Sequence, residues 1–272
     1  MSELLKALEA KSAKLHKQLA QQDVKVLTLD IENAPNIVHT WGLFKQNIGI
    51  GQIVQPATTF GVGYKWYHEK QAHFLSDHVH GHEEMVKQTH ALLDEADIVI
   101  GFNHVGFDLP HINRESVLAG LGPNKPYKNV DLLRVARKQF RFTSNKLDFL
   151  AQQLGLGSKT AHTGHDLWVR CMAGDPAAWK LMEKYCKQDV YLTERLYDRL
   201  LPWIPNHPHR GVWVGDAWAC TNCGHDVDPE TAVSSLSVAA VTAYNSYPCP
   251  NCDHWLRGTR IRSEKLKTRS TV

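Results

Sequence analysis

The chain has 272 residues, a formal net charge of +3, a hydrophobic fraction of 43% and a charged fraction of 22%. These values are ordinary for a globular protein, and the length suffices for one sizeable core plus a second small unit. Residues 1–22 are charged throughout and no stretch is apolar enough to span a membrane, so we expect neither a secretory signal peptide nor a membrane partner. The expected location is the cytoplasm, where the six cysteines would be thiols or metal ligands rather than disulfides.

Hydrophobic periodicity predicts a series of strands and helices along the chain. A leucine stripe from Leu4 to Leu19 predicts a helix over 1–22. Strands are expected over 24–30, 48–56, 58–68 and 97–103. Helices are expected over 81–97, 108–119, 130–137, 146–155 and 176–201. This order predicts an α/β fold with a mixed sheet flanked by helices.

The stretch "VKVLTLDIEN" places Asp30 and Glu32 on one face of the first strand, because strand residues two apart share a face. Burying one unpaired carboxylate costs several kcal/mol and burying two costs more. Either the strand end runs out into solvent, or the two acids hold something positive.

Two later segments carry further acids. Asp108 follows a buried strand, with Asn103 five residues before it, and on its own it fits a helix N-terminus. Tyr185 and Asp189 are four residues apart on the last long helix, a spacing that taken singly fits a surface contact. Together with Asp30 and Glu32, however, these residues form a set of hard oxygen ligands from different elements, as a divalent metal pair for phosphoryl transfer requires.

The segments "LDIEN", "NHVGFD" and "YCKQD" resemble the three motifs of the DEDD superfamily of 3′–5′ exonucleases, in the branch that carries tyrosine in its third motif. The resemblance covers about residues 24–201 with the motifs in the right order, and it implies a ribonuclease-H-like fold. The run "WGLFKQNIGIGQIVQP" is similar to small stand-alone nucleases of phage type.

The resemblance implies a role for each matching residue. Asp30, Glu32, Asp108 and Asp189 would ligate two Mg²⁺ or Mn²⁺ ions, one activating a water and the other stabilising the leaving 3′ oxygen. Tyr185 would position that water, Glu32 would also contact the terminal 3′-hydroxyl, and Asn103 would lie near the substrate. Cleavage would then release nucleoside 5′-monophosphates.

A second motif lies near the C-terminal end, where "CTNCGHD" and "CPNCDHW" form two CxxC knuckles. Cys220, Cys223, Cys249 and Cys252 complete a closed tetrahedral zinc site, although a redox-active CxxC is a competing interpretation. Such a small module needs the metal for its stability. It would bind nucleic acid through Trp255 and the nearby cations, or alternatively it would dock on a partner protein.

Basic residues gather beyond this module, with six cations against one acid from residue 257 onward. Arg257, Arg260 and Arg262 begin this run, which is typical either of a polyanion-binding appendage or of a solvated tail. We therefore divide the chain into a helix (1–22), a DEDD exonuclease domain (23–202), a linker (203–217), a zinc ribbon (218–256) and a basic tail (257–272).

The predicted function is a two-metal 3′–5′ exonuclease acting on DNA, with single strands or 3′ ends as substrate, in the host cytoplasm if the protein is phage-encoded. An exoribonuclease remains an alternative, because no feature of the sequence recognises the 2′-hydroxyl. A catalytically inactive nucleic-acid-binding adaptor on the same fold is a third hypothesis. Protein partners are not predicted.

Overall fold

The computed structural model describes residues 24–232, 235–239 and 242–261, and the helix expected over 1–22 lies outside these residues. The chain divides into two compact units. The first spans Lys25–Asp198, and the second contains, among the described residues, Val24 and those from Arg199 onward. Within the described ranges, no helix has the length and apolar character needed to cross a membrane.

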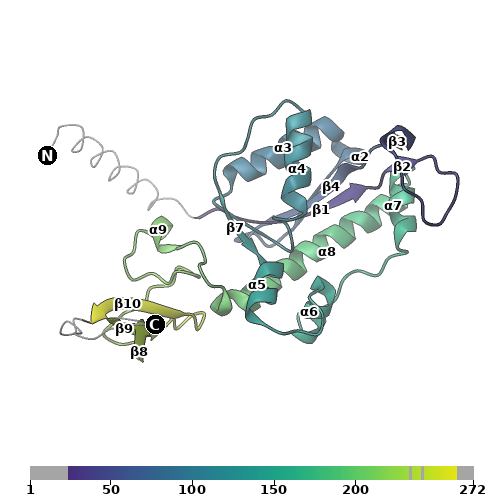
Figure 1. Ribbon diagram of the computed structural model, residues 1–272. Helices are drawn as coiled ribbons and strands as arrows, with labels where there is room; N and C mark the ends of the chain where they lie inside the picture. The colour runs from purple at the N-terminus through teal and green to yellow at the C-terminus, as the bar shows by residue number, and fades with distance from the viewer. Residues whose placement is uncertain (1–23, 233–234, 240–241, 262–272) are drawn as a thin grey trace, which may run out of the picture. The chain divides into compact units, whose positions relative to one another are not determined.

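The first unit is built on a five-stranded mixed sheet with the order β5-β4-β1-β6-β7 (Figure 1). Its strands are β1 (Val26–Ala34), β4 (Thr58–Trp66), β5 (His73–Ser76), β6 (Ile98–Gly101) and β7 (Lys128–Asp131). β4 runs antiparallel to β1 and β5 antiparallel to β4, whereas β6 is parallel to β1 and β7 is parallel to β6. The predicted mixed sheet flanked by helices is therefore confirmed.

Helices cover both faces of this sheet (Figure 1). They are α2 (Asp77–His80), α3 (His82–Glu95), α4 (Asp108–Leu118), α5 (Leu132–Gln139), α6 (Leu147–Gln153), α7 (His165–Met172) and α8 (Pro176–Leu200). The odd-numbered residues Leu27, Leu29 and Ile31 of β1 pack in one core with residues of α3 and α4. A second core joins Ala34 and Phe60 to residues of α7 and α8. The alternation of β1 thus directs its even-numbered residues, Asp30 and Glu32 among them, away from the α3–α4 core.

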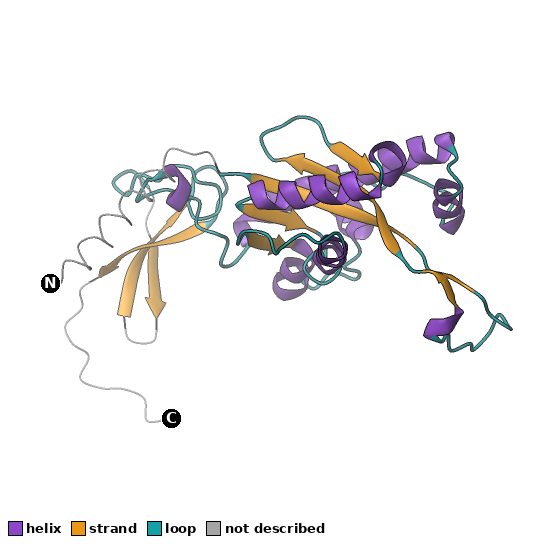
Figure 2. Cartoon of the chain, turned by 90° about the horizontal axis from the view of Figure 1, so that it is seen from above, coloured by secondary structure: helices purple, strands orange, loops and turns teal. Residues whose placement is uncertain are grey.

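The strand expected over 48–56 does not belong to this sheet. It contributes a short helix, η1 (Ile50–Gln52), and β3 (Ile53–Gln55), which pairs with β2 (Ile37–Val38). These elements form an arm between β1 and β4, which Figure 2 shows extending away from the sheet. Trp41, at 101% exposure, and Ile50, at 90%, contribute nothing to the core. The prediction that this segment joins the main sheet was wrong. Its alternating pattern belongs to β3, which pairs with β2 in a separate two-stranded sheet.

Short elements account for the other differences from the expected order. β5 and β7 have four residues each and were not predicted, and neither was α7. The helix expected from 130 begins at Leu132, because Val130 and Asp131 still belong to β7 and the Asp131 side chain caps the helix. The long helix expected over 176–201 is present as α8.

The second unit contains η2 (Leu201–Trp203), α9 (Gly211–Val214) and a three-stranded antiparallel sheet with the order β10-β9-β8. Its strands are β8 (Ser235–Ala239), β9 (Thr242–Pro248) and β10 (Trp255–Ile261). β10 continues across the expected boundary between the zinc ribbon and the basic tail.

Candidate active site

Among the described residues, the C-terminal part of β1 has no strand paired with it on the side of β6. Its pairing with β6 stops at Thr28 and Ile100, and β1 continues for six residues beyond that point. The carboxylate of Asp108, the first residue of α4, accepts a hydrogen bond from the backbone N–H of Ile31 at 3.0 Å. This bond satisfies a donor that β6 no longer reaches, and it holds Asp108 beside the segment that carries Asp30 and Glu32.

A glycine of β4, Gly63, allows α8 to approach the same segment closely. Asp30 lies opposite Gly63 and Glu32 opposite Gly61. A Cβ atom built on Gly63 would lie 2.8 Å from the Cys186 sulfur, a separation that only glycine permits. The buried Cys186 thiol donates to the carbonyl of Asp30 at 3.8 Å. The sequence "FGVGY" therefore explains why α8 lies directly over the two acids.

Tyr185 and Asp189 occupy this face of α8 and are both buried. Lys159, from the loop before α7, contacts the Asp189 carboxylate and donates to the Tyr185 hydroxyl at 3.2 Å. Its ammonium group also lies 5.2 Å from the centroid of the Tyr185 ring. Sequence reasoning missed Lys159, because a lysine in an aperiodic loop carries no local signal of a distant partner.

Two aromatic side chains complete the surroundings of Tyr185. His162 and Trp168 meet its ring edge to face, with centroids 4.8 Å and 6.0 Å away. The side chain of Trp168 also hydrogen-bonds to Glu32. Sequence reasoning missed both residues as well, since His162 lies in an aperiodic loop and α7, which carries Trp168, was not predicted. Both rings restrict the orientation of the tyrosine, and Trp168 also restricts that of the glutamate.

The acids strongly perturb each other's ionisation. Burial raises the pKa of Asp30 well above its ordinary value, and the charges of Asp108, Asp189 and Glu32 raise it further. Burial and the charge of Asp189 raise the pKa of Glu32 to about 8. Burial likewise raises the pKa of Asp108 to about 7 and raises that of Asp189, although Lys159 opposes the latter shift. One lysine therefore does not neutralise the cluster.

Tyr185 and Lys159 keep their protons in this environment. Burial and the charge of Asp189 raise the pKa of the Tyr185 phenol, so it remains a hydrogen-bond donor at neutral pH. Burial opposes the charge on Lys159, but Asp189 and Tyr185 outweigh it and raise the pKa of the ammonium group. The site thus combines four acids with a neutral phenol and a cation.

The donor set fits divalent metal ions. Mg²⁺ and Mn²⁺ prefer carboxylate oxygens, which all four acids supply. Asp189 has one buried oxygen, Oδ1, without a hydrogen-bond partner among the described residues. The ligand atoms of Asp30, Glu32 and Cys186 lie within 4.8 Å of one another. The thiol of Cys186 is a poor ligand for such hard ions, and its burial favours a packing role.

The nucleic-acid-binding residues expected from the sequence are spread over both units. Asn103 is exposed in the loop before α4, with a positive φ of 66° and its backbone N–H bonded to Asp131. In the second unit, Trp255 is 54% exposed and the Arg257 guanidinium lies 4.8 Å from the centroid of the Tyr244 ring. Arg260 donates to the Thr242 hydroxyl at 2.9 Å. Arg262 lies outside the described residues.

The four cysteines of the second unit form one cluster, with all their sulfurs within 4.8 Å of one another. The sulfurs of Cys220 and Cys252 are 3.7 Å apart, and those of Cys223 and Cys249 are 3.5 Å apart. Four sulfurs bound to one zinc ion at about 2.3 Å lie about 3.8 Å apart in a tetrahedron, whereas a disulfide bond is about 2.05 Å long. The cluster therefore fits zinc.

The two knuckles share one backbone conformation. Cys220 donates its N–H to the carbonyl of His225 at 2.8 Å, and Cys249 donates to that of His254 at the same distance. The residue four positions after each of these cysteines, Gly224 or Asp253, has a positive φ. The Nδ1 atom of His254 hydrogen-bonds to the carbonyl of Pro202 at 2.8 Å. This contact favours the four cysteines, rather than this histidine, as the zinc ligands.

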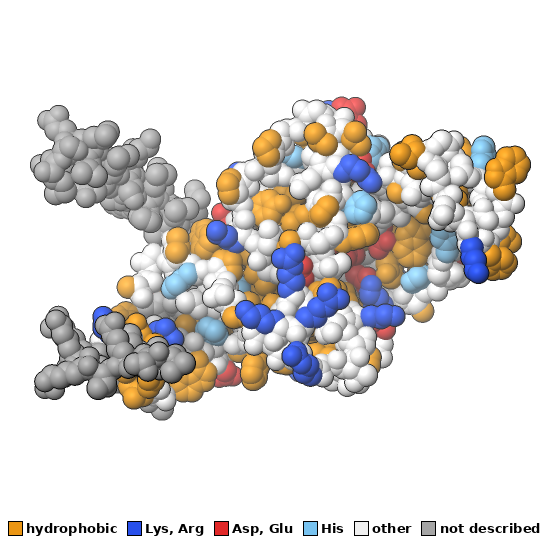
Figure 3. Space-filling view, viewed as in Figure 1, with side chains coloured by type: hydrophobic (Ala, Val, Ile, Leu, Met, Phe, Trp, Pro, Cys, Tyr) orange, Lys and Arg blue, Asp and Glu red, His pale blue; other side chains and the backbone are white. Residues whose placement is uncertain are grey.

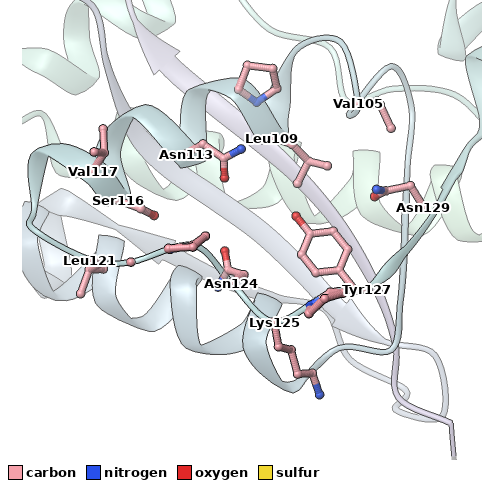
Figure 4. Close-up of a pocket in the computed structure, with 14 residues that line it drawn as sticks. Val105, Leu109, Asn113, Ser116, Val117, Leu121, Asn124, Lys125, Tyr127 and Asn129 are labelled. Carbon is pink, nitrogen blue, oxygen red and sulfur yellow. The ribbon is translucent and has the colours of Figure 1, made fainter.

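A separate hollow of about 660 Å³ lies between α4 and the segment 121–129 (Figure 4). Its lining includes Leu109, Val117, Tyr127 and Asn129, with Lys125 as the charged member. No acid, histidine or cysteine lines it. The hollow therefore lacks the groups that hydrolytic chemistry would require, and the acidic cluster is the candidate active site of the first unit.

A mixed sheet with carboxylates at the end of its central strand and on a helix across one face defines a nuclease-type hydrolase fold. Residues 49–201 match the family model of the RNase H superfamily, which covers more than half of the chain. The chain belongs to this superfamily, a membership that indicates a nucleic acid ligand and divalent metal ions. A comparison with curated proteins finds no match for this chain.

Proposed function

We propose that this chain is a metal-dependent 3′–5′ exonuclease that hydrolyses the terminal phosphodiester bond of single-stranded or frayed DNA and releases nucleoside 5′-monophosphates. The observation that carries the proposal is the cluster of buried carboxylates on β1, α4 and α8, whose charges raise the pKa of Asp30 and Glu32, with Tyr185 on the same face of α8. Four clustered carboxylates are unfavourable without cations, because two of them about 4 Å apart repel by about 4 kcal/mol at an effective dielectric of about 20.

Asp30, Glu32, Asp108 and Asp189 would hold two Mg²⁺ or Mn²⁺ ions. When bound, these ions would supply an activated water and charge stabilisation for the leaving 3′ oxygen. The Tyr185 phenol stays protonated, so it can donate a hydrogen bond that orients a water for attack on the terminal phosphate. Glu32, which Trp168 holds in place, would accept a hydrogen bond from the 3′-hydroxyl of the terminal nucleotide. The four cysteines would bind one structural Zn²⁺.

The test is incubation of the full chain with 5′-labelled single-stranded DNA and the matching RNA, with Mg²⁺, with Mn²⁺ and without divalent cations. We expect a metal-dependent ladder that shortens from the 3′ end of the DNA. The variant Asp30→Asn should lose at least about a thousandfold in rate. Glu84→Gln, which changes an exposed acid on α3, should retain full activity.

A stability measurement on Asp30→Asn separates loss of catalysis from loss of folding. Removing one charge of the buried cluster should increase the free energy of unfolding without added divalent cations by about 1–2 kcal/mol. Binding of both nucleic acids without cleavage of either would instead support the adaptor hypothesis. A ladder on RNA alone would make the chain an exoribonuclease.

A further inference from the structure

A basic surface lies on the first unit, formed by residues other than the C-terminal cations identified in the sequence. We define it by Arg134, Arg137 and Lys138 of α5 together with Arg141 and Lys146 of the following segment. All five side chains are exposed, and no acid occurs between residues 132 and 147. Figure 3 shows Lys and Arg side chains gathered over α5 and α6, with Asp and Glu side chains beside them.

The amphipathic pattern of α5 turns these cations outward. Leu132, Leu133, Val135 and Ala136 are buried, so the rest of the helix faces solvent. Cations in a last helical turn interact favourably with the helix dipole, which gives Arg137 and Lys138 a structural role. Arg141 also contacts this end of α5, because its guanidinium donates to the carbonyl of Arg137, whereas Arg134 and Lys146 have no such role at the helix C-terminus. The basic surface therefore exceeds what the stability of α5 requires.

Most of these cations lack an acidic partner. Some surface cations of the first unit pair with acids of the same segment, as in Lys87–Glu83 at 2.5 Å and Lys187–Glu183 at 2.6 Å. Among the described residues, no carboxylate lies within ion-pair distance of Arg137, Lys138, Arg141 or Lys146. Arg134 lies 3.5 Å from the Asp131 carboxylate, yet its side chain is 65% exposed. The positive charge of this surface is therefore available to an external anion.

Hydrogen bonds join the two acids that flank the basic surface in the sequence to loops beside the candidate active site. Asp131, the N-cap of α5, accepts from the backbone N–H of Asn103 at 3.0 Å, in the loop that leads to Asp108. Asp148 of α6 accepts from the backbone N–H of Lys159 at 2.8 Å. Lys159 in turn contacts Asp189. A strand whose end reached the acids would therefore have this surface beside it.

Aromatic rings accompany the cations. Phe140 and Phe142 are half-buried in the segment after α5, with centroids 5.2 Å apart. Arg141 stands between them in the sequence, and its guanidinium donates to the carbonyls of Arg137 and Phe140 at 3.3 Å and 3.5 Å. Cations interleaved with aromatic rings bind single strands without sequence preference, through phosphates and base faces.

We propose that the basic surface binds the phosphodiester backbone of the substrate strand upstream of its 3′ end, as the principal binding surface of the chain for single-stranded DNA. The inference rests on the proposed function and adds the path of the strand along α5. It also assigns the main phosphate contacts to the first unit rather than to Arg257 and Arg260 of the second.

The experiment uses the full chain with the triple substitution Arg137→Gln, Lys138→Gln and Arg141→Gln. The matched control is Lys70→Gln, Lys87→Gln and Lys125→Gln, three exposed lysines outside the basic surface that carry the same total charge. Fluorescence anisotropy of a labelled thymidine 20-mer, without divalent cations, would give the dissociation constant at several salt concentrations. Circular dichroism would verify that each variant is folded.

We expect the α5 variant to bind the 20-mer at least about tenfold more weakly and to lose about 2 units from the slope of log K against log salt, because each phosphate contact on a single strand contributes about 0.7. The control should bind like the wild type. An unchanged slope in the α5 variant would overturn the inference, as would a loss confined to the variant Arg257→Gln and Arg260→Gln. Equal losses in the α5 variant and the control would also overturn it, because net charge alone would then set the affinity.

A second substrate separates this inference from the proposed function. The p-nitrophenyl ester of thymidine 5′-monophosphate reaches the acids but is too short to reach the basic surface. Wild type and α5 variant should hydrolyse it at equal rates, whereas the variant should degrade the 20-mer at least about tenfold more slowly at subsaturating concentration. An equal loss on both substrates would place α5 in the structure of the active site and overturn its role in strand binding. No hydrolysis of either substrate by the wild type would refute the proposed function, and the binding slopes would still decide the inference.

Discussion

At the scale of single residues, Lys159 determines the electrostatic state of the acidic cluster. It contacts Asp189 and Tyr185, and its charge lowers the pKa of Asp30, Glu32 and Asp189, opposing the upward shifts that burial and mutual repulsion produce. Its ammonium group is therefore positioned where a divalent cation would also be attracted. We therefore expect the lysine to stabilise the cluster in the absence of metal and to compete with any divalent ion that binds there.

The variant Lys159→Met should separate these two effects. Without added divalent cations, the acids lose their cation, and the free energy of unfolding should fall by about 1–3 kcal/mol. The affinity for Mg²⁺ should rise, because the competing charge is gone. Thermal unfolding and calorimetric titration with Mg²⁺ measure the two quantities. Lys180→Met, an exposed position on α8, should change neither. An Mg²⁺ affinity equal to that of the wild type would show that Lys159 does not compete for the carboxylates.

At the scale of secondary structure elements, the close contact between β4 and α8 positions the site. Gly63 lets the helix approach until a Cβ atom would meet both Cys186 and Val190. Farther along α8, Glu194 forms a bidentate ion pair with the buried Lys65 of β4, at 2.7 Å and 2.8 Å. The helix is thus held against the strand at two places, and Asp189 lies between them.

The variant Gly63→Ala should push α8 away from β4. A Cβ atom there would lie 2.8 Å from the Cys186 sulfur and 3.1 Å from Val190 Cγ2, so we expect a loss of about 1–3 kcal/mol in the free energy of unfolding. Activity should fall by at least about tenfold at temperatures where the variant is folded, because Asp189 and Tyr185 move with the helix. Gly51→Ala, in the arm where nothing lies within 4 Å, is the control. Full activity of folded Gly63→Ala would show that the helix position tolerates this displacement.

The elements that the sequence predicts are those with strong local patterns. β1 and α8 have clear periods over 9 and 25 residues, and their acids follow from these periods. β5 and β7 form strands because they pair with β4 and β6, whereas their four residues are too few to show an alternating pattern. Lys159 reaches the site across 30 residues through a loop, which no periodicity encodes. The acids were therefore predictable as a set, whereas the cation and the aromatic residues around them depend on tertiary packing.

At the scale of the whole molecule, the chain combines two units whose hydrophobic cores differ in size and composition. The unit spanning Lys25–Asp198 has large hydrophobic cores, among them those that join β1 to α3 and α4 and to α7 and α8, so we expect it to fold without a metal ion. The core of the other unit consists of Cys220, Val227, Tyr247 and Cys249 with a few half-buried neighbours. We therefore expect the two units to respond differently to pH and to chelation.

The first unit should lose stability as pH rises when no divalent cation is added. The folded-state pKa is about 8 for Glu32 and about 7 for Asp108, both above their ordinary values. The folded state therefore holds protons that the unfolded state has released, and this stabilisation, complete below about pH 4, is lost as pH rises through the folded pKa values. We expect a decrease of about 2–4 kcal/mol between pH 6 and pH 8. Calorimetry across this range measures it, and saturating Mg²⁺ should flatten the dependence. A stability that rises with pH would contradict the raised pKa values.

The second unit should unfold when zinc is removed, while the first stays folded. Two of the four residues in its core are cysteines, so a chelator removes both the metal and the bonds that join the knuckles. Structural zinc sites contribute about 10–16 kcal/mol in small modules, more than such a core supplies by burial. Hydrogen exchange after chelation should show loss of protection over β9 and β10 and retained protection over β1 and β6. Added Zn²⁺ should restore the protection, whereas Mg²⁺, which disfavours thiolates, should not. Unchanged exchange over β9 and β10, with zinc release verified in the same sample, would show that this unit folds without the metal.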